Sequence, residues 1–510
     1  MILSNLFDWS ELWNSLRESI AVPNVWAMTA TIVYFLGIFH ALHAIMKVRL
    51  SQSAIAWSVF LLSMPWLGIP VYWIFGRRKF EGYTDRMRSV KNRYDRDQSD
   101  LVALLHPWRP VFSEPLRTLD TAALQLGSLP FSFGNQVDLL IDGQQTYPAI
   151  LGDIAEAKDY ILFQTYILND DKTGREFLTA LGNAVRRGAR VHLLYDEVGS
   201  NSLTSRYLRQ AEKLGIVTSG FKSTKGRGNR FQINFRNHRK IIVIDGKVGF
   251  IGGLNIGDEH LGLDRSIGHW RDTHIRVSGP AVKALQYSFL SDWYWAMDYV
   301  PATSWDFTQL PKHHNGKSNS NSIGDSERGD EVLILPNGPN DKVEVCSLFI
   351  GSLIDIARKR IWIATPYFVP DEPTLSALKI ASLRGVEVRL IVPRKVDHLA
   401  LRLCTLSYYE DLNHLGIKVY EYLPGFMHQK VILIDDLVAG VGTVNMDNRS
   451  FHLNFEAMAY VASARFVASV EAMLIKDISH SVVADLETFE KQKLPMRLLI
   501  RIARLFSAIL

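Results

Sequence analysis

Cysteine is nearly absent from this sequence: only Cys346 and Cys404 occur among 510 residues, and they form no Cys-x-x-Cys pair. This scarcity argues against a disulfide framework or a cysteine-based zinc site and fits a reducing compartment. We interpret each cysteine as a small buried apolar residue. Carboxylates and histidines do not cluster at metal-ligand spacing either, so we expect no metal and no cofactor.

An excess of one charge is also missing. Lys and Arg number 57 against 52 Asp and Glu, a formal net charge of +5. Hydrophobic residues make up 47% and charged residues 21%, which excludes a disordered chain and a polytopic transporter. The small basic excess suits an anionic surface, but it does not choose between nucleic acid and lipid.

Charge is lacking altogether from two stretches, residues 25–45 and 54–75. The first is long enough to cross a bilayer. The second contains Pro65 and Pro70, which membrane helices tolerate. The two stretches predict two transmembrane helices; a buried helical hairpin of a soluble protein is the alternative.

Basic residues concentrate after the second stretch, in residues 76–130, beginning with Arg77, Arg78 and Lys79. The positive-inside rule therefore places the C-terminal part in the cytoplasm. Lys47 and Arg49, in the short link between the stretches, weaken this asymmetry because it would lie outside.

Residues 1–24 lack the basic start of a signal peptide, and Asp8, Glu11 and Glu18 argue against one. Tryptophans and leucines recur there at helical spacing, as in a helix lying at a membrane surface. A poorly ordered terminus explains the same residues.

The chain from residue 131 alternates short apolar strands with amphipathic helices, as in an α/β protein. The pattern occurs twice, in residues 131–307 and 332–488, so we expect two homologous α/β lobes with largely parallel sheets and crossover helices. Residues 308–331 are rich in Ser, Asn and Gly and predict a flexible linker. Residues 489–510 predict a basic amphipathic helix, which would lie on an anionic membrane or dock on the protein.

A matched pair of stretches marks the two lobes: NHRKIIVIDGKVGFIGGLN from Asn237 to Asn255, and MHQKVILIDDLVAGVGTVN from Met427 to Asn445. The two stretches lie 190 residues apart and keep every spacing. This spacing is too long for a solenoid repeat. The shared positions are His238 and His428, Lys240 and Lys430, Asp245 and Asp435, and Asn255 and Asn445.

Each pair of His and Lys begins a buried strand, and residues two apart in a strand point to the same face. If the two faces met, two His, two Lys and two Asn would surround one pocket suited to a phosphodiester. One imidazole can attack phosphorus, while the other protonates the leaving alkoxide and later deprotonates the incoming hydroxyl. We expect Asp245 and Asp435, which follow the strands, to make turn or cross-lobe hydrogen bonds, although they count as members of the catalytic motif.

The repeated His-x-Lys-x-x-x-x-Asp with Gly-[Gly/Thr]-x-Asn resembles the phospholipase D superfamily. The resemblance implies two lobes with one shared active site and a phosphohistidine intermediate. It also implies that a carboxylate downstream of each motif orients a histidine; Asp272 and Glu456 match that position. By analogy His238 is the nucleophile, although the symmetric motifs favour neither histidine.

PWLGIPVYWIFG, TPYFVPD and GTVNMDNRSFHLNFE, with the two apolar stretches, are similar to membrane-anchored bacterial cardiolipin synthases. That similarity implies condensation of two phosphatidylglycerols into cardiolipin and glycerol in a bacterial inner membrane. The implied partners are anionic lipid and the membrane, and an oligomer is possible. A membrane-bound phospholipase D is the main alternative; two membrane helices argue against a nuclease and hence against nucleic acid. A non-enzymatic scaffold would be expected to lose at least one His or Lys. Tyr166 and Tyr367, at corresponding strand ends, belong to the site or to the core.

Overall fold

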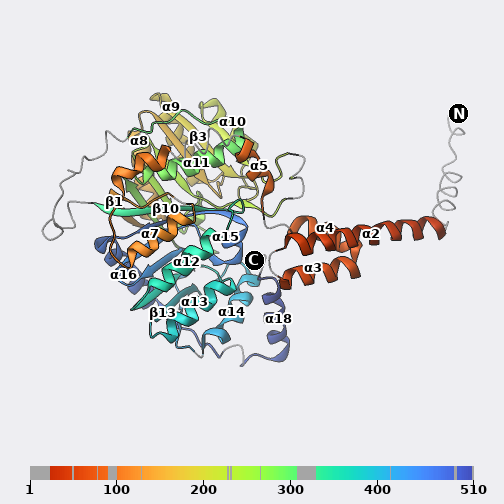
Figure 1. The fold of residues 1–510 in the computed structure, drawn as a ribbon. Helices are drawn as coiled ribbons and strands as arrows, with labels where there is room; N and C mark the ends of the chain where they lie inside the picture. Colours follow the sequence, from red (N-terminus) through yellow and green to blue (C-terminus); the bar gives the residue numbers. More distant parts are fainter. Residues whose placement is uncertain are drawn as a thin grey trace, which may run out of the picture. The chain divides into compact units, whose positions relative to one another are not determined.

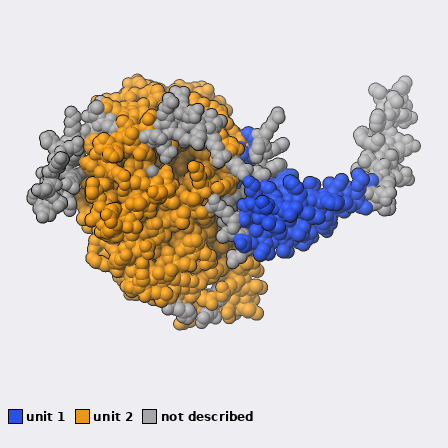
Figure 2. Space-filling model, in the orientation of Figure 1, with its two compact units in different colours: residues 1–78, 226–234 blue, residues 79–225, 235–510 orange. Residues whose placement is uncertain are grey.

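The computed structural model describes residues 23–48, 51–76, 79–89, 100–127, 129–226, 229, 232–264, 266–306, 329–413, 415–487 and 491–507. The chain forms two compact units, residues 1–78 with 226–234 and residues 79–225 with 235–510 (Figure 2). Residues 1–22 of the expected N-terminal segment and 308–328 of the expected linker lie outside the described residues.

The smaller unit contains three helices, α2 (Pro23–Lys47), α3 (Ser51–Ser63) and α4 (Pro65–Phe75). Among the described helices, α2 is the one long and apolar enough to cross a membrane, over Val25–Lys47. It corresponds to the first expected transmembrane stretch.

The second expected span, residues 54–75, is wrong as a continuous helix. Met64 leaves the helical conformation, with φ −137° and ψ 62°, and Pro65 starts α4. A proline has no N–H to continue the helix and disfavours the α conformation of the residue before it. The α4 helix folds back on α3. The rings of Trp57 on α3 and Tyr72 on α4 lie 5.2 Å apart. The result is a helical hairpin that packs against α2.

The larger unit is built on one long sheet, which consists of two halves with the same strand order (Figure 1). We call these halves the first lobe (residues 131–306) and the second lobe (residues 329–487). The first lobe has the order β1 (Ser132–Ile141), β9 (Thr273–Ser278), β7 (Val248–Gly252), β6 (Ile241–Ile244), β2 (Tyr160–Thr165), β3 (Arg190–Asp196), β4 (Val217–Phe221). The second has the order β10 (Asp330–Asn337), β19 (Asn454–Val461), β17 (Val438–Gly442), β16 (Val431–Ile434), β11 (Arg360–Ala364), β13 (Glu387–Pro393), β14 (Lys418–Tyr422), β20 (Ser481–Val483). The lobes join where β1 pairs with β10.

The expectation of largely parallel sheets is wrong. Within the long sheet, β2, β3 and β4 are parallel, as are β11, β13 and β14, whereas the other neighbours in the strand order are antiparallel. The reason is a hairpin in each lobe, β6–β7 and β16–β17. In the first lobe Asp245 and Gly246 turn the chain with positive φ angles of 53° and 62°. Asp-Gly between apolar runs is a strong hairpin signal, and the sequence interpretation missed it.

Helices cover both faces of the sheet (Figure 1). One apolar core contains residues of α11 (Val282–Met297) and α16 (Ala464–Ser479) and runs across both lobes. On the other face each lobe has its own core. The helices of these two cores are α8 (Asp142–Glu156), α9 (Lys172–Arg186) and α10 (Ser205–Lys213) in the first lobe, and α12 (Val345–Ile356), α13 (Glu372–Leu383) and α14 (Leu399–Asn413) in the second, where α7 (Leu116–Gln125) also packs.

The predicted C-terminal helix is present as α18 (Leu494–Leu505), and it docks on α14. Arg504 lies 2.8 Å from Asp411, and Ile500 is buried. Leu498 and Leu505 remain exposed. Docking therefore does not use the whole apolar surface of the helix.

The two cysteines, Cys346 on α12 and Cys404 on α14, are both buried, as expected.

Candidate active site

Two short pairs of parallel strands connect the lobes at the repeated motifs. In one, β5 (Arg236–Asn237) of the first lobe pairs with β19 of the second. In the other, β15 (Gly425–Met427) of the second lobe pairs with β8 (His269–Arg271) of the first. Each histidine extends its pair: the N–H of His238 donates to the Phe455 carbonyl at 2.9 Å, and that of His428 to the Arg271 carbonyl at 2.8 Å.

Each histidine meets a carboxylate of the opposite lobe. His238 Nδ1 lies 2.9 Å from Glu456 Oε2, and His428 Nδ1 lies 2.9 Å from Asp272 Oδ2. The strand pairing brings Glu456 beside His238 and Asp272 beside His428, since each carboxylate directly follows the residue that accepts the histidine N–H. The carboxylates thus act across the lobe interface, and Nε2 of each ring is left to face a substrate.

Both imidazoles are held in the neutral form. Burial lowers the pKa of His238 to about 4, against the opposing effect of Glu456. Burial, with the charges of Lys430 and Lys240, lowers the pKa of His428 well below its usual value. A neutral Nε2 with Nδ1 bonded to a carboxylate is an available nucleophile.

The two lysines lie beside the histidines and are buried. Lys240 Nζ donates to the His238 carbonyl at 2.8 Å, and Lys430 Nζ donates to the His428 carbonyl. Burial lowers the pKa of Lys240 to about 7 and that of Lys430 to about 8. The charge of Lys430 also lowers the pKa of Lys240, so the ammonium groups of the two lobes lie within interaction range. Two ammonium groups crowded in this way favour an anion between them.

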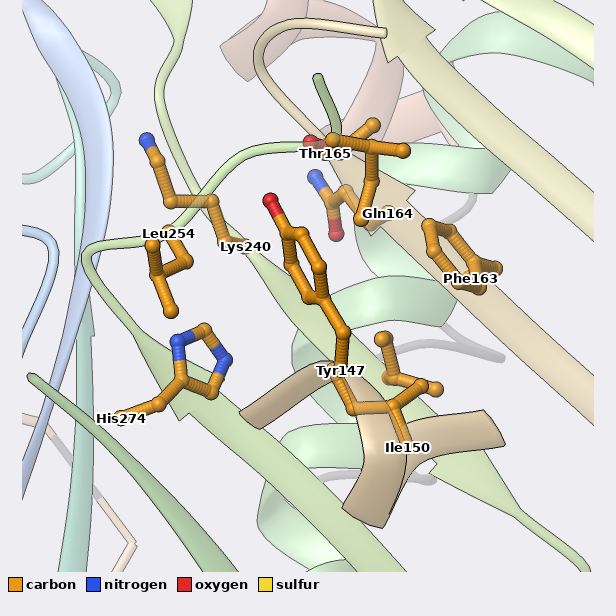
Figure 3. A pocket seen from close by; sticks show the side chains of 10 residues that line it. Tyr147, Ile150, Phe163, Gln164, Thr165, Lys240, Leu254 and His274 are labelled. Carbon is orange, nitrogen blue, oxygen red and sulfur yellow. The ribbon is translucent and has the colours of Figure 1, made fainter. Parts of the chain in front are cut away.

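A small cavity lies beside the Lys240 side chain. Tyr147, Leu254 and His274 lie around it with the Lys240 side chain (Figure 3). Its volume of about 10 Å³ would hold about one water molecule. It is too small for a lipid head group.

The two asparagines of the motif are not equivalent. Asn255 Oδ1 accepts from the Ile167 N–H at 3.1 Å, which leaves its amide NH₂ as the donor. Asn445 is buried, and its Oδ1 has no hydrogen-bond partner. The two Gly-rich turns therefore present different groups.

Asp245 and Asp435, the third residues of the repeated motif, bind backbone N–H groups of a neighbouring strand. Asp245 accepts from the N–H groups of Lys158, Asp159 and Tyr160 at 2.8–2.9 Å. Asp435 accepts in the same way from three consecutive N–H groups of residues 358–360. Each lies five residues after the lysine, at the far end of a four-residue strand, which is about 17 Å along an extended chain. The bonds are within one lobe, so the cross-lobe alternative is wrong.

Gly253, in the Gly-rich turn of the first lobe, lies directly against the carboxylate of Asp272. A Cβ at Gly253 would collide with Asp272 Oδ1. Glycine at this position therefore leaves room for the carboxylate that lies beside His428.

Similar proteins match this arrangement over nearly the whole chain. The family model "Cardiolipin synthase, PLD-like domain" matches residues 150–293 and 350–478. Cardiolipin synthase A of Pseudomonas fluorescens (strain SBW25) is 39% identical over 497 residues, 96% of this chain and 99% of that protein. Cardiolipin synthase A of Pseudomonas syringae pv. syringae (strain B728a) is 40% identical over 486 residues, 94% of this chain and 97% of that protein.

The chain belongs to the phospholipase D-like cardiolipin synthase family. Its fold is also similar to a solved phosphatidylserine synthase of Haemophilus influenzae, with a TM-score of 0.57 and 16% identity. That likeness covers 77% of this chain and 100% of the other. It shows that the larger unit has the fold of this superfamily.

Sequence reasoning missed the ion pairs that support the site of this cardiolipin synthase family member. Arg239, between His238 and Lys240, forms a buried ion pair with Asp292 of α11 at 2.9 Å. At the matching place, Gln429 donates to Asp477 of α16 at 2.7 Å. Arg271 of the first lobe bonds the same Asp477 at 2.8 Å. The alternation of side chains along a strand could have indicated the first ion pair. If His238 and Lys240 face the substrate, Arg239 between them faces the core and needs a buried acidic partner.

The tyrosines at the strand ends differ in their contacts. The Tyr166 ring lies 4.8 Å from the His238 ring and 5.3 Å from Lys240 Nζ. Tyr367 donates to Asp397 at 2.6 Å and packs against the core of the first lobe. Tyr166 therefore contacts the site directly, whereas Tyr367 connects the lobes.

Within the described ranges, no three His, Cys, Asp or Glu side chains gather in a way that could hold a metal ion.

Proposed function

We propose that this protein is a cardiolipin synthase that transfers a phosphatidyl group between two phosphatidylglycerols. The observation that supports this most is the pair of neutral imidazoles, each bonded to a carboxylate of the opposite lobe. Two matched histidines can act on the same phosphorus atom, one as the nucleophile and the other as the general acid and base. The cardiolipin synthases similar to this chain over 94–96% of its length support the transferase over a hydrolase.

In the first step, His238 Nε2 attacks the phosphorus of the donor lipid. The bond from phosphorus to the head-group glycerol oxygen breaks, and that oxygen takes the proton of His428 Nε2–H. A phosphodiester anion between the rings favours protonated His428 and offsets the burial that lowers its pKa. The products are phosphatidyl-His238 and free glycerol.

In the second step, His428 Nε2 takes the proton of the free head-group hydroxyl of the second phosphatidylglycerol. Its oxygen attacks phosphorus, and the bond from phosphorus to His238 Nε2 breaks. Lys240, Lys430 and Asn255 offer donors to the phosphoryl oxygens in both steps. Asn445 would do so with its amide turned to present the NH₂ group.

The substrate class is anionic lipid rather than nucleic acid, and the catalytic lobes work at the cytoplasmic face of a bacterial inner membrane. The apolar α2 helix and the basic residues that follow the apolar stretches support both points. Lipid substrates explain why the enzyme carries its own membrane segment.

Purified protein incubated with phosphatidylglycerol vesicles tests the function. We expect cardiolipin and glycerol in equal amounts. Phosphatidic acid as the lipid product, with no cardiolipin, would instead establish a membrane-bound phospholipase D. Mass spectrometry of the acid-quenched protein should find the phosphatidyl group on His238, and its presence on His428 would exchange the two roles.

A further inference from the structure

The two halves of the site are alike at the reacting residues and different beside them. At the repeat spacing, Arg236 of the first lobe matches Phe426 of the second, and Arg449 of the second matches Glu259 of the first. The surroundings of His238 therefore carry arginines where the other half carries an aromatic ring and an acid.

Arg236 lies on the reactive side of its strand. Asn237 and Arg239 point the other way, to Gln164 and Asp292. Because side chains alternate along an extended chain, Arg236 shares the face of His238 and Lys240. The matching residue of the second lobe, Phe426, lies beside the catalytic histidine of that lobe. Its ring is 5.6 Å from the His428 ring.

Arg449 reaches the same place from the second lobe, in the segment that follows Asn445. Its charge acts on Tyr166, the ring that packs on His238. Burial and the charge of Arg236 lower the pKa of Arg449, so two guanidinium groups from different lobes lie within interaction range in a half-buried setting.

Two carboxylates, Asp196 and Asp447, lie near these arginines and also accept backbone N–H groups. Asp196 accepts from the N–H groups of Val198, Gly199 and Asn237 at 2.9–3.0 Å. Asp447 accepts from the Ser450 N–H at 2.7 Å. Burial raises the pKa of both carboxyls, to about 6 for Asp447. The half of the site at His238 is therefore rich in positive charge beyond the two lysines.

We propose that Arg236 and Arg449 bind the phosphate of the acceptor lipid. This inference rests on the proposed transferase function. The acceptor phosphatidylglycerol has its own phosphate one glycerol away from the attacking hydroxyl, and the donor phosphate would repel it without a cationic partner. Water needs no such partner. The two arginines thus favour transfer to lipid over hydrolysis.

The test compares two acceptors that reach the same phosphohistidine. Arg449→Gln and Arg236→Gln should lower cardiolipin formation about 10- to 100-fold, mainly through KM for phosphatidylglycerol. Formation of phosphatidylethanol from the same donor with ethanol as acceptor should stay within about twofold, because ethanol has no phosphate. Arg449→Lys should recover part of the cardiolipin activity. Arg276→Gln, a half-buried arginine paired with Asp153 away from the site, is the control.

Equal loss of cardiolipin and phosphatidylethanol, or no loss of either, would overturn the acceptor site. A wild-type protein that forms phosphatidic acid but no cardiolipin would instead sink the proposed function itself. Thermal unfolding of each variant separates loss of binding from loss of fold.

The helices of the smaller unit carry a second, independent inference about the membrane. The hairpin tip at Pro65 reaches only to Gly37 of α2, where a Cβ at Gly37 would lie 2.9 Å from the Pro65 Cβ. From Gly37 to Lys47 the helix rises about 15 Å, half of a hydrocarbon core of about 30 Å. The outer surface of all three helices is apolar; Phe35, Phe39 and Ile55 are each at least 65% exposed.

The basic residues that flank the hairpin agree with a hairpin that enters and leaves the membrane on the same side. In the sequence, Lys47 and Arg49 precede the hairpin, and Arg77, Arg78 and Lys79 follow it. Two full spans would place the first pair outside, against the positive-inside rule. A hairpin places all five together.

We infer that α2 crosses the membrane once and that α3 and α4 insert to mid-depth from the cytoplasmic side, which leaves the N-terminus outside. Single cysteines in a background with Cys346→Ser and Cys404→Ser test this by labelling spheroplasts with a membrane-impermeant maleimide. Ser10→Cys should react from outside, and Ser51→Cys only after permeabilisation, as should the control Lys359→Cys on the larger unit. Reaction of Ser51→Cys from outside, or protection of Ser10→Cys, would establish two spans and overturn the hairpin topology.

Discussion

At the scale of single residues, the proposed mechanism depends on two imidazoles that have the same kind of partner, a carboxylate of the opposite lobe, but different tasks. His238→Ala removes the proposed nucleophile, and His428→Ala removes the acid and base. We expect the rate of cardiolipin formation to fall at least about 10³-fold in each variant. The first loses the covalent intermediate, and the second loses proton transfer to and from the glycerol oxygens. Near-normal turnover in either variant, measured with phosphatidylglycerol vesicles, would contradict a shared pocket.

The carboxylates orient the rings from across the interface. Glu456→Gln and Asp272→Asn preserve the size and shape of each side chain. They weaken the hydrogen bonds to Nδ1 of His238 and His428, because the carboxylate charge is lost. We expect kcat to fall about 10²- to 10⁴-fold, as for an imidazole left in the wrong tautomer. Unchanged kcat in both variants would mean that the carboxylates are merely structural. Thermal unfolding provides the control, since a misfolded variant would lose activity for another reason.

The buried lysines make binding of the head group dependent on pH. With pKa values of about 7 and 8, Lys240 and Lys430 lose their protons as the pH rises through 7 to 8. Glycerophosphoglycerol stays a monoanion over this range, so its inhibition constant should rise between pH 6 and pH 9. At the acid end, activity should fall as His238 is protonated near pH 4. Inhibition that is constant from pH 6 to 9 would contradict charged lysines as the phosphate ligands.

At the scale of elements, the third residue of the motif holds the sheet together. Asp245 and Asp435 each bind three backbone N–H groups at the start of the neighbouring strand. Asp245→Ala and Asp435→Ala should each lower the free energy of unfolding by about 1–3 kcal/mol, since three partly exposed backbone N–H groups lose a charged acceptor. At a temperature where the variants remain folded, kcat should stay near that of the wild type. Loss of kcat without loss of stability, by calorimetry and turnover together, would return these residues to the catalytic set.

The sequence predicted the strands of the motif well and their pairing poorly. The apolar runs 241–244 and 431–434 are strands, as expected. Whether a neighbour runs parallel depends on the turn that follows, and the positive φ angles at Asp245 and Asp435 produce hairpins. In the same way, the uncharged run 54–75 is helical, but Pro65 divides it. Composition predicts the type of an element, whereas one turn residue decides its direction.

At the scale of the whole molecule, buried polar contacts bind one lobe to the other. Arg271 of the first lobe and Asp477 of the second are 3% and 5% exposed and lie 2.8 Å apart. Arg271→Met should destabilise the fold by about 3–5 kcal/mol, because Asp477 stays buried without its cation. Replacing both, as Arg271→Met with Asp477→Leu, should recover much of this loss. Lys359→Met, in an exposed ion pair with Asp436, should change the stability by less than about 1 kcal/mol.

Calorimetry of these variants also tests the coupling of the lobes. One shared core and the β1–β10 pairing predict a single unfolding transition. Two separate transitions in the wild type, or no change in Arg271→Met, would show that the lobes fold independently of this contact.

The sequence by itself predicted the reacting residues, because chemistry at phosphorus calls for His, Lys and Asn at set spacings, and the repeat displays them twice. It also indicated the membrane attachment, since charge-free runs of this length are recognisable in composition alone. Only the tertiary structure decided which carboxylate lies beside which histidine, which strands of the two lobes pair, and that the second apolar run folds back on itself at Pro65. Those properties depend on residues brought together from distant parts of the chain, and no local pattern encodes which strand of one lobe will pair with the other.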